Sequence, residues 1–181
     1  MLCGALLLVA GCGSTTGSVS ETVDPPVLPD NYITYENADG WSISHPDSWK
    51  IDESNYASLG VIRIVIESES KTFKPNFGIT KTATEFTEDV YDYEELSEVV
   101  GEALEETGAT NVVSKKFVTP VGPSARMDGD MIKESLNLKL TQVQMYRDYK
   151  GFILNFMSDV SEYDALMPDV ELMLLSFNPG K

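Results

Sequence analysis

One amphipathic segment, flanked on both sides by strand-type sequence, constrains the fold of this 181-residue chain more than any other feature. Side chains that can face a core recur there at helical spacing: Tyr93, Leu96, Val100, Ala103, Leu104 and Thr107. Glutamates occupy the other side, as in a helix that lies on a sheet. The pattern predicts a helix of about residues 90–107, with Asp89 or Asp92 as its N-cap and Gly108 as its left-handed end.

Runs of β-branched and aromatic residues predict strands on both sides of this helix. Those before the helix are Tyr32–Glu36, Trp41–His45, Trp49–Ile51, Leu59–Ile66 and Phe77–Ala83. Those after it are Asn111–Thr119, a short strand within Ala125–Ile132, Leu136–Arg147 and Phe152–Met157. Asp128-Gly129-Asp130 predicts a kink in the second of these later strands. In the third, the apolar residues change face near Thr141, which indicates either a β-bulge or a second burial environment.

A second helix is predicted near the C-terminus. Proline is poorly tolerated inside a helix but well tolerated in its first turn, so we place the start near Pro168 and expect a helix of about residues 168–176. Its core-facing residues are expected to be Val170, Met173, Leu174 and Phe177. The order of strands, helix, strands and helix predicts an α+β fold with a central antiparallel β-sheet, one crossover helix and one C-terminal helix.

The N-terminus resembles the lipobox of a bacterial lipoprotein signal peptide. An apolar run that ends in Val9-Ala10-Gly11 precedes Cys12, and it is about half of the ~20 residues needed to span a bilayer. The resemblance implies that residues 1–11 are a signal peptide and that Cys12 carries diacylglycerol and a further acyl chain such as palmitate. The usual basic residues are missing, because Lys50 is the first Lys or Arg, so we expect the true start to lie upstream of Met1.

Composition divides the rest of the chain into two parts. Residues 12–31 are rich in Ser, Thr, Gly and Pro, which predicts a disordered tether. Residues 32–181 are long enough for one domain with a sizeable core. Cys3 lies in the signal peptide, so Cys12 is the only cysteine of the mature chain, which excludes thiol nucleophiles and zinc–thiolate sites. We expect a protein held at the extracytoplasmic face of the cell membrane by lipid on Cys12.

The chain is strongly acidic, with a formal net charge of −16. Nucleic acid is therefore excluded as a partner, because phosphate binding needs a basic patch. Anionic headgroups should also repel the folded domain, so we expect only the lipid on Cys12 to hold the protein at the membrane. Ten carboxylates and no Lys or Arg lie between Glu85 and Glu106. This segment is either a solvated helix face or a docking surface for a basic partner or a weak cation site.

The sequence has no recognisable catalytic or cofactor-binding pattern. His45 is the only histidine, and its place before a proline in a strand-turn motif favours a structural role. Trp41 and Trp49 are expected to anchor the core. Asp128-Gly129-Asp130 and Asp89-Val90-Tyr91-Asp92 have fewer ligands than an EF-hand loop, so we interpret them as a turn and a cap. We expect no catalytic residue, no metal site and no cofactor, and hence a protein that is not an enzyme.

Three stretches resemble the PsbP/Mog1-like superfamily: Gly40–Trp49, the hairpin Leu138–Met157, and the ending Leu172–Phe177. Members carry an early aromatic-x-Ile-x-Tyr-Pro-x-x-Trp motif, a long antiparallel hairpin and a last helix that closes in Ser-Phe. His45 stands where an aromatic residue is common, at a structural position. The resemblance implies a central antiparallel sheet between helices but no single activity, since PsbP members stabilise photosystem II and Mog1 binds a small GTPase.

Together these observations predict a membrane-anchored extracytoplasmic lipoprotein. Its domain is expected to act as a non-enzymatic module that binds another, unidentified protein or assists a membrane complex. The alternative is a surface module that binds a small ligand or a cation through the acidic segment 85–106.

Overall fold

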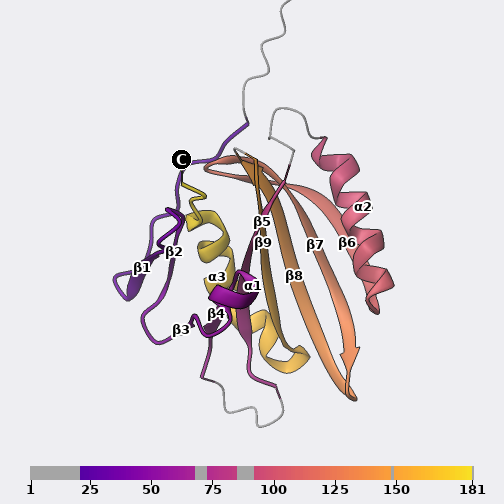
Figure 1. Ribbon diagram of the computed structural model, residues 1–181. Helices are drawn as coiled ribbons and strands as arrows, with labels where there is room; N and C mark the ends of the chain where they lie inside the picture. Colours follow the sequence, from indigo (N-terminus) through magenta and orange to yellow (C-terminus); the bar gives the residue numbers. More distant parts are fainter. Residues whose placement is uncertain (1–20, 68–72, 85–91, 148, 181) are drawn as a thin grey trace, which may run out of the picture.

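The computed structural model describes residues 21–67, 73–84, 92–147 and 149–180. Its centre is a seven-stranded antiparallel sheet in the order β3-β4-β5-β9-β8-β7-β6 (Figure 1). The strands are β3 (Lys50–Asp52), β4 (Val61–Val65), β5 (Asn76–Ala83), β6 (Ala109–Thr119), β7 (Gly122–Lys133), β8 (Leu136–Arg147) and β9 (Lys150–Asp159). The predicted α+β fold with a central antiparallel sheet is confirmed.

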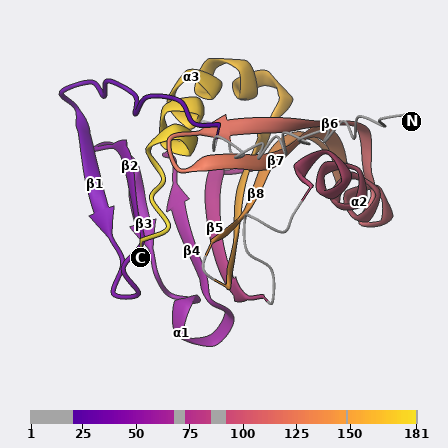
Figure 2. The same cartoon turned by 90° about the horizontal axis from the view of Figure 1, so that it is seen from above.

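A separate antiparallel pair and three helices complete the described structure. The pair is β1 (Tyr32–Glu36) with β2 (Ser42–Pro46), and the helices are α1 (Tyr56–Leu59), α2 (Tyr93–Glu106) and α3 (Val160–Ser176). Helix α3 and the β1–β2 pair share one core with the sheet, whereas α2 packs on β6 and β7 (Figure 2). No helix in the described part of the chain is long and apolar enough to cross a membrane.

The main core lies between the sheet, α3 and the β1–β2 pair. Aromatic residues dominate it, and the ring of Phe177 lies 5.9 Å from that of Trp41 and 5.2 Å from that of Phe152, centroid to centroid. Trp41 and Trp49 are both buried, as predicted. Tilted and edge-on ring pairs of this kind add to the stabilisation that comes from burial alone. The C-terminal Phe177 thereby holds the end of α3 against the first hairpin.

The acidic crossover helix lies where the sequence predicts it. Its buried residues Tyr93, Leu96 and Val100 form a second cluster with Ala125 and Met127 of β7. The Asp92 side chain accepts hydrogen bonds from the amides at positions 94 and 95, so Asp92, of the two predicted candidates, is the N-cap. At the other end Gly108 has φ +98°, the left-handed backbone that glycine adopts without steric cost.

The C-terminal helix is longer than predicted, because it begins at Val160 and not near Pro168. Asp159 caps it by accepting a hydrogen bond from the Ser161 amide at 2.9 Å. Pro168 lies inside the helix on an exposed position. The carbonyl of Asp164, which loses its intrahelical donor there, belongs to a residue that is also exposed and can bind water instead. The sequence prediction used the proline rule without this solvent-facing exception.

Two details of the strands also differ from expectation. The β7 strand pairs without a break through Asp128 and Asp130, and the register shift lies opposite, in β6 between Thr110 and Val113. The pairing of β8 with β7 and with β9 has no bulge where its apolar residues change face. The strand instead has two burial environments, because Leu140 is buried on one face of the sheet and Val143 on the other. The one-turn helix α1, which Gly60 ends, has no sequence signal beyond that glycine.

Candidate binding groove

The residues that the sequence singles out do not come together in a site among the described residues. Cys12 lies outside the described residues. His45 is only 2% exposed in β2, and its Nδ1 donates to the Pro46 carbonyl at 2.8 Å. A buried ring with a local backbone partner fits the structural role that the sequence favours.

The acidic segment is described only from residue 92 onward. Its glutamates, from Glu94 to Glu106, are exposed, and Glu98, Glu102 and Glu105 line a shallow recess with Val112 and Ser114 of β6. Nowhere in the described ranges do three or more His, Cys, Asp or Glu side chains come close enough to hold a metal ion. The two carboxylates of the Asp-Gly-Asp sequence make separate contacts, Asp128 with Arg126 and Asp130 with Asn111.

A buried ion network joins α3 to the sheet. Arg126 of β7 donates through Nε to both carboxylate oxygens of Asp128 at 3.0 Å, and through Nη1 to Glu171 of α3 at 2.5 Å. Its guanidinium also lies 5.4 Å from the centre of the Phe117 ring. Burial acts to lower the pKa of Arg126, but the hydrogen bond to Glu171 and the charge of Asp128 outweigh it and raise that pKa.

A hydroxyl chain extends this network to the first turn of α3. Thr141 donates to Asp128 at 2.7 Å and is hydrogen-bonded to the Tyr163 hydroxyl. Burial raises the pKa of Tyr163, so its phenol stays protonated at neutral pH. Every charge in the network has an opposite charge beside it, so we interpret it as a structural clamp and not as a catalytic group.

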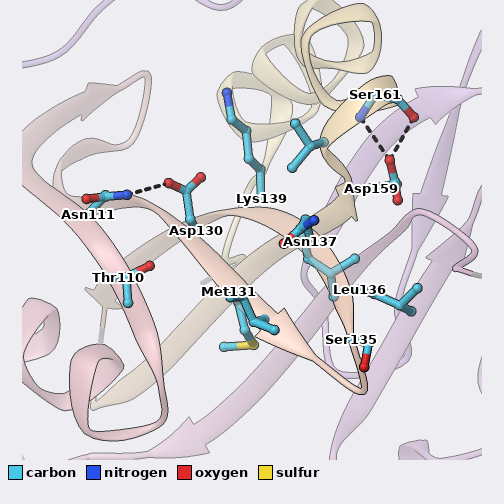
Figure 3. A pocket seen from close by; sticks show the side chains of 13 residues that line it. Thr110, Asn111, Asp130, Met131, Ser135, Leu136, Asn137, Lys139, Asp159 and Ser161 are labelled. Atoms are coloured by element: carbon cyan, nitrogen blue, oxygen red, sulfur yellow. Dashed lines mark hydrogen bonds between the residues drawn. The ribbon is translucent and has the colours of Figure 1, made fainter.

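The groove next to this clamp has a volume of about 790 Å³ (Figure 3). Its walls come from the start of β6, the β7–β8 hairpin, the end of β9 and the first turn of α3. The lining mixes polar and apolar side chains: Thr110, Asn111, Asp130, Met131, Ile132, Ser135, Leu136, Asn137, Leu138, Lys139, Asp159, Val160 and Ser161. It lies at the end of the sheet opposite the β6–β7 turn.

Local chemistry fixes the walls of this groove. Glu134 and Ser135 both have positive φ, 50° and 70°, so the hairpin closes with the kind of turn that matches strand twist. Asp159 accepts from the Ser161 hydroxyl at 2.7 Å as well as from its amide, and these hydrogen bonds lower the pKa of Asp159. Asp130 accepts from the Asn111 amide at 2.8 Å, and Figure 3 shows this pair on the β6 side.

Two exposed apolar side chains, Ile132 and Val160, line the groove, and a third, Val113, lies outside its lining on the neighbouring strand β6. Ile132 is 73% exposed, Val113 60% and Val160 44%. The pairing register puts Val113 opposite Asp128, and Ile132 is on the same side of β7 as Asp128, so both lie on the face that carries α3. Single exposed apolar residues are ordinary, but two that line one recess, with a third on the same face of the sheet, are typical of a binding surface.

Sequence reasoning did not identify the groove. Its only local signal is Ile132, an apolar residue on a strand face that otherwise carries Asp128 and Asp130. The partners that complete the groove come from β6, β9 and α3, which are distant in the sequence.

A second recess of about 660 Å³ lies beside α1. Lys81 and Tyr56 both donate to Asp39 there, at 2.8 Å and 2.5 Å. The hydrogen bonds from Lys81 and Tyr56 lower the pKa of Asp39. These contacts join the first hairpin to β5. We therefore interpret Asp39, Tyr56 and Lys81 as structural residues.

No family model and no curated protein matches the chain. Solved structures do match it in fold. Cyanobacterial PsbP from Synechocystis sp. PCC 6803 aligns with a TM-score of 0.56 and 11% identity, over 84% of this chain and 94% of that chain. LpqN, described as involved in cell envelope biogenesis of Mycobacterium tuberculosis, aligns with a TM-score of 0.55 and 13% identity, over 78% of this chain and 86% of that chain.

A third structure belongs to PA94 of Pseudomonas aeruginosa, a protein of unknown function. It aligns with a TM-score of 0.53 and 15% identity, over 83% of this chain and 99% of that chain. Identities this low show a shared fold and not a shared activity. The chain therefore has the α+β fold of the PsbP-like proteins, a seven-stranded antiparallel sheet with helices on its two faces.

Proposed function

We propose that this protein is a lipid-anchored, extracytoplasmic module without catalytic activity, and that it binds another protein at the groove beside the β7–β8 hairpin. The lipid is attached at Cys12, which the lipobox resemblance marks as the acylated residue. The fold supports an accessory or binding role, since the PsbP-like proteins that share it are not known as enzymes.

The apolar rim of the groove is the observation that carries this proposal. Ile132 and Val160 expose hydrocarbon in the same groove as the hydrogen-bonding groups of Asn137 and Lys139. Apolar side chains beside satisfied polar groups are the usual make-up of a protein–protein interface. The net charge of −16 favours a partner whose rim is basic, because opposite potentials speed encounter and suppress wrong partners.

Site-specific crosslinking tests this surface. A photoreactive amino acid at position 132 should give one discrete adduct in membranes of the native cells, and Val160→Ser should reduce that adduct several-fold. Position 59 is the matched control, because Leu59 is an equally exposed apolar residue, at 66%, outside the groove. Equal adducts from positions 132 and 59, or none from position 132, would contradict binding at the groove.

A further inference from the structure

The N-terminal segment is held on the domain before β1 begins. Glu21 accepts a hydrogen bond from Lys116 of β6, and the Val23 amide donates to the Thr119 carbonyl at 3.4 Å. Farther along, Leu28 is half-buried. Figure 2 shows the segment crossing from the end of β6, past α3, to β1. The last part of the predicted tether therefore lies on the domain surface.

Lys116 is the electrostatic centre of this attachment. It is an exposed cation on an edge strand of a chain with a net charge of −16. The carboxylates that act on it are those of Glu21, Glu94 and Asp92. The hydrogen bond that Lys116 donates to Glu21, with smaller contributions from the charges of Glu94 and Asp92, raises the pKa of Lys116. The segment is attached by one ion pair and one backbone hydrogen bond at neighbouring positions of the same strand.

The attachment point lies at one end of the sheet and the groove at the other. Thr119 pairs with Gly122 at the β6–β7 turn, whereas the groove surrounds the opposite, hairpin end of β7. From Gly122 to Lys133 an extended strand covers roughly 36 Å at about 3.3 Å per residue. Figure 1 shows the indigo segment that begins at residue 21 near the β6–β7 end.

The free length of the tether is shorter than this separation. Nine peptide steps join Cys12 to Glu21, and nine steps reach at most about 30 Å at full extension. A flexible chain of that length has a typical span of only about 17 Å. A tether that was free up to Tyr32 would have twenty steps and would reach roughly 65 Å, enough for the domain to turn over completely.

We propose that attachment of residues 21–23 to β6 orients the domain on the membrane, with the β6–β7 end toward the bilayer and the groove facing away from it. The inverted pose needs a tether longer than the nine available steps. It follows that the partner bound at the groove is a water-exposed protein domain and not a lipid or a membrane-embedded segment. This inference rests on the proposed anchor at Cys12 and on the proposed role of the groove.

Energy transfer to labelled lipid headgroups measures this orientation directly. Full-length Cys3→Ser protein is coupled through Cys12 to a maleimide lipid in vesicles, with a fluorescent amino acid at position 135 or at position 178. Both positions are exposed; the first is in the turn of the β7–β8 hairpin, and the second follows α3 and pairs with Ser42 at the start of β2. We expect at least a threefold higher transfer efficiency from position 178 than from position 135.

Two changes distinguish the effect of the attachment to β6 from the effect of tether length on the orientation. Lys116→Glu should reduce the difference between the two positions, while Lys133→Glu, the same charge change at the hairpin end, should leave it unchanged. A twenty-residue Gly/Ser insertion after Gly17 should abolish the difference. Equal transfer from positions 135 and 178 in the parent protein, or no effect of Lys116→Glu, overturns the orientation. Because the lipid is coupled chemically, these results do not depend on acylation of Cys12 in cells.

Discussion

At the scale of single residues, Arg126 shows how this acidic chain keeps a cation inside. Its side chain is 8% exposed, and its guanidinium contacts one carboxylate on its own strand and another on α3. Burial of a charge is tolerated only where opposite charges and hydrogen bonds replace water. The sequence does not predict that either carboxylate pairs with Arg126, because its pattern places Asp128 in a turn and Glu171 among many helix carboxylates.

Arg126→Met should destabilise the domain by about 2 kcal/mol. Loss of one partner from a buried ion pair costs about 3–5 kcal/mol, and the partial exposure of Asp128 and Glu171 reduces this figure. Urea denaturation measures the effect. Arg63→Met, at an exposed position of β4, is the matched control and should change little. Equal midpoints for the two variants would show that the ion network contributes nothing to stability.

At the scale of elements, the sequence predicts most of this fold because periodicity is a local signal. The strand runs and α2 follow from spacing alone, and both the Asp92 cap and the Gly108 end come from residues with strong preferences. The predicted start of α3, near Pro168, was wrong because the rule for proline ignores which side of the helix faces water. The groove was missed because it forms only where β6, the β7–β8 hairpin and α3 meet.

Pro168→Ala tests the explanation for α3. Alanine restores an amide that can bond to the carbonyl four residues earlier, and it removes the clash of the proline ring with that carbonyl. We expect a gain of about 1–2 kcal/mol in the free energy of unfolding, less than the ~3 kcal/mol of a fully buried helix interior, because the site is exposed. A loss of stability by urea denaturation would show that the proline is accommodated without cost.

At the scale of the whole molecule, we propose an anchor at Cys12, a short tether and a binding domain. The chain carries a strong negative charge, so we expect anionic headgroups to repel the domain and membrane residence to depend on lipid at Cys12. One acyl chain binds only marginally, and the two or three chains implied by the lipobox resemblance would make the attachment stable. In the proposed orientation, the groove at the far end of the sheet faces partners outside the bilayer.

Membrane fractionation of cells that express Cys12→Ala tests the anchor on which this account rests. We expect the variant to leave the membrane pellet and appear in the soluble extracytoplasmic fraction. Cys3→Ala, which changes the other cysteine without touching the acylation site, should remain in the pellet. Retention of Cys12→Ala in the membrane pellet at the level of the parent protein would contradict the lipid anchor.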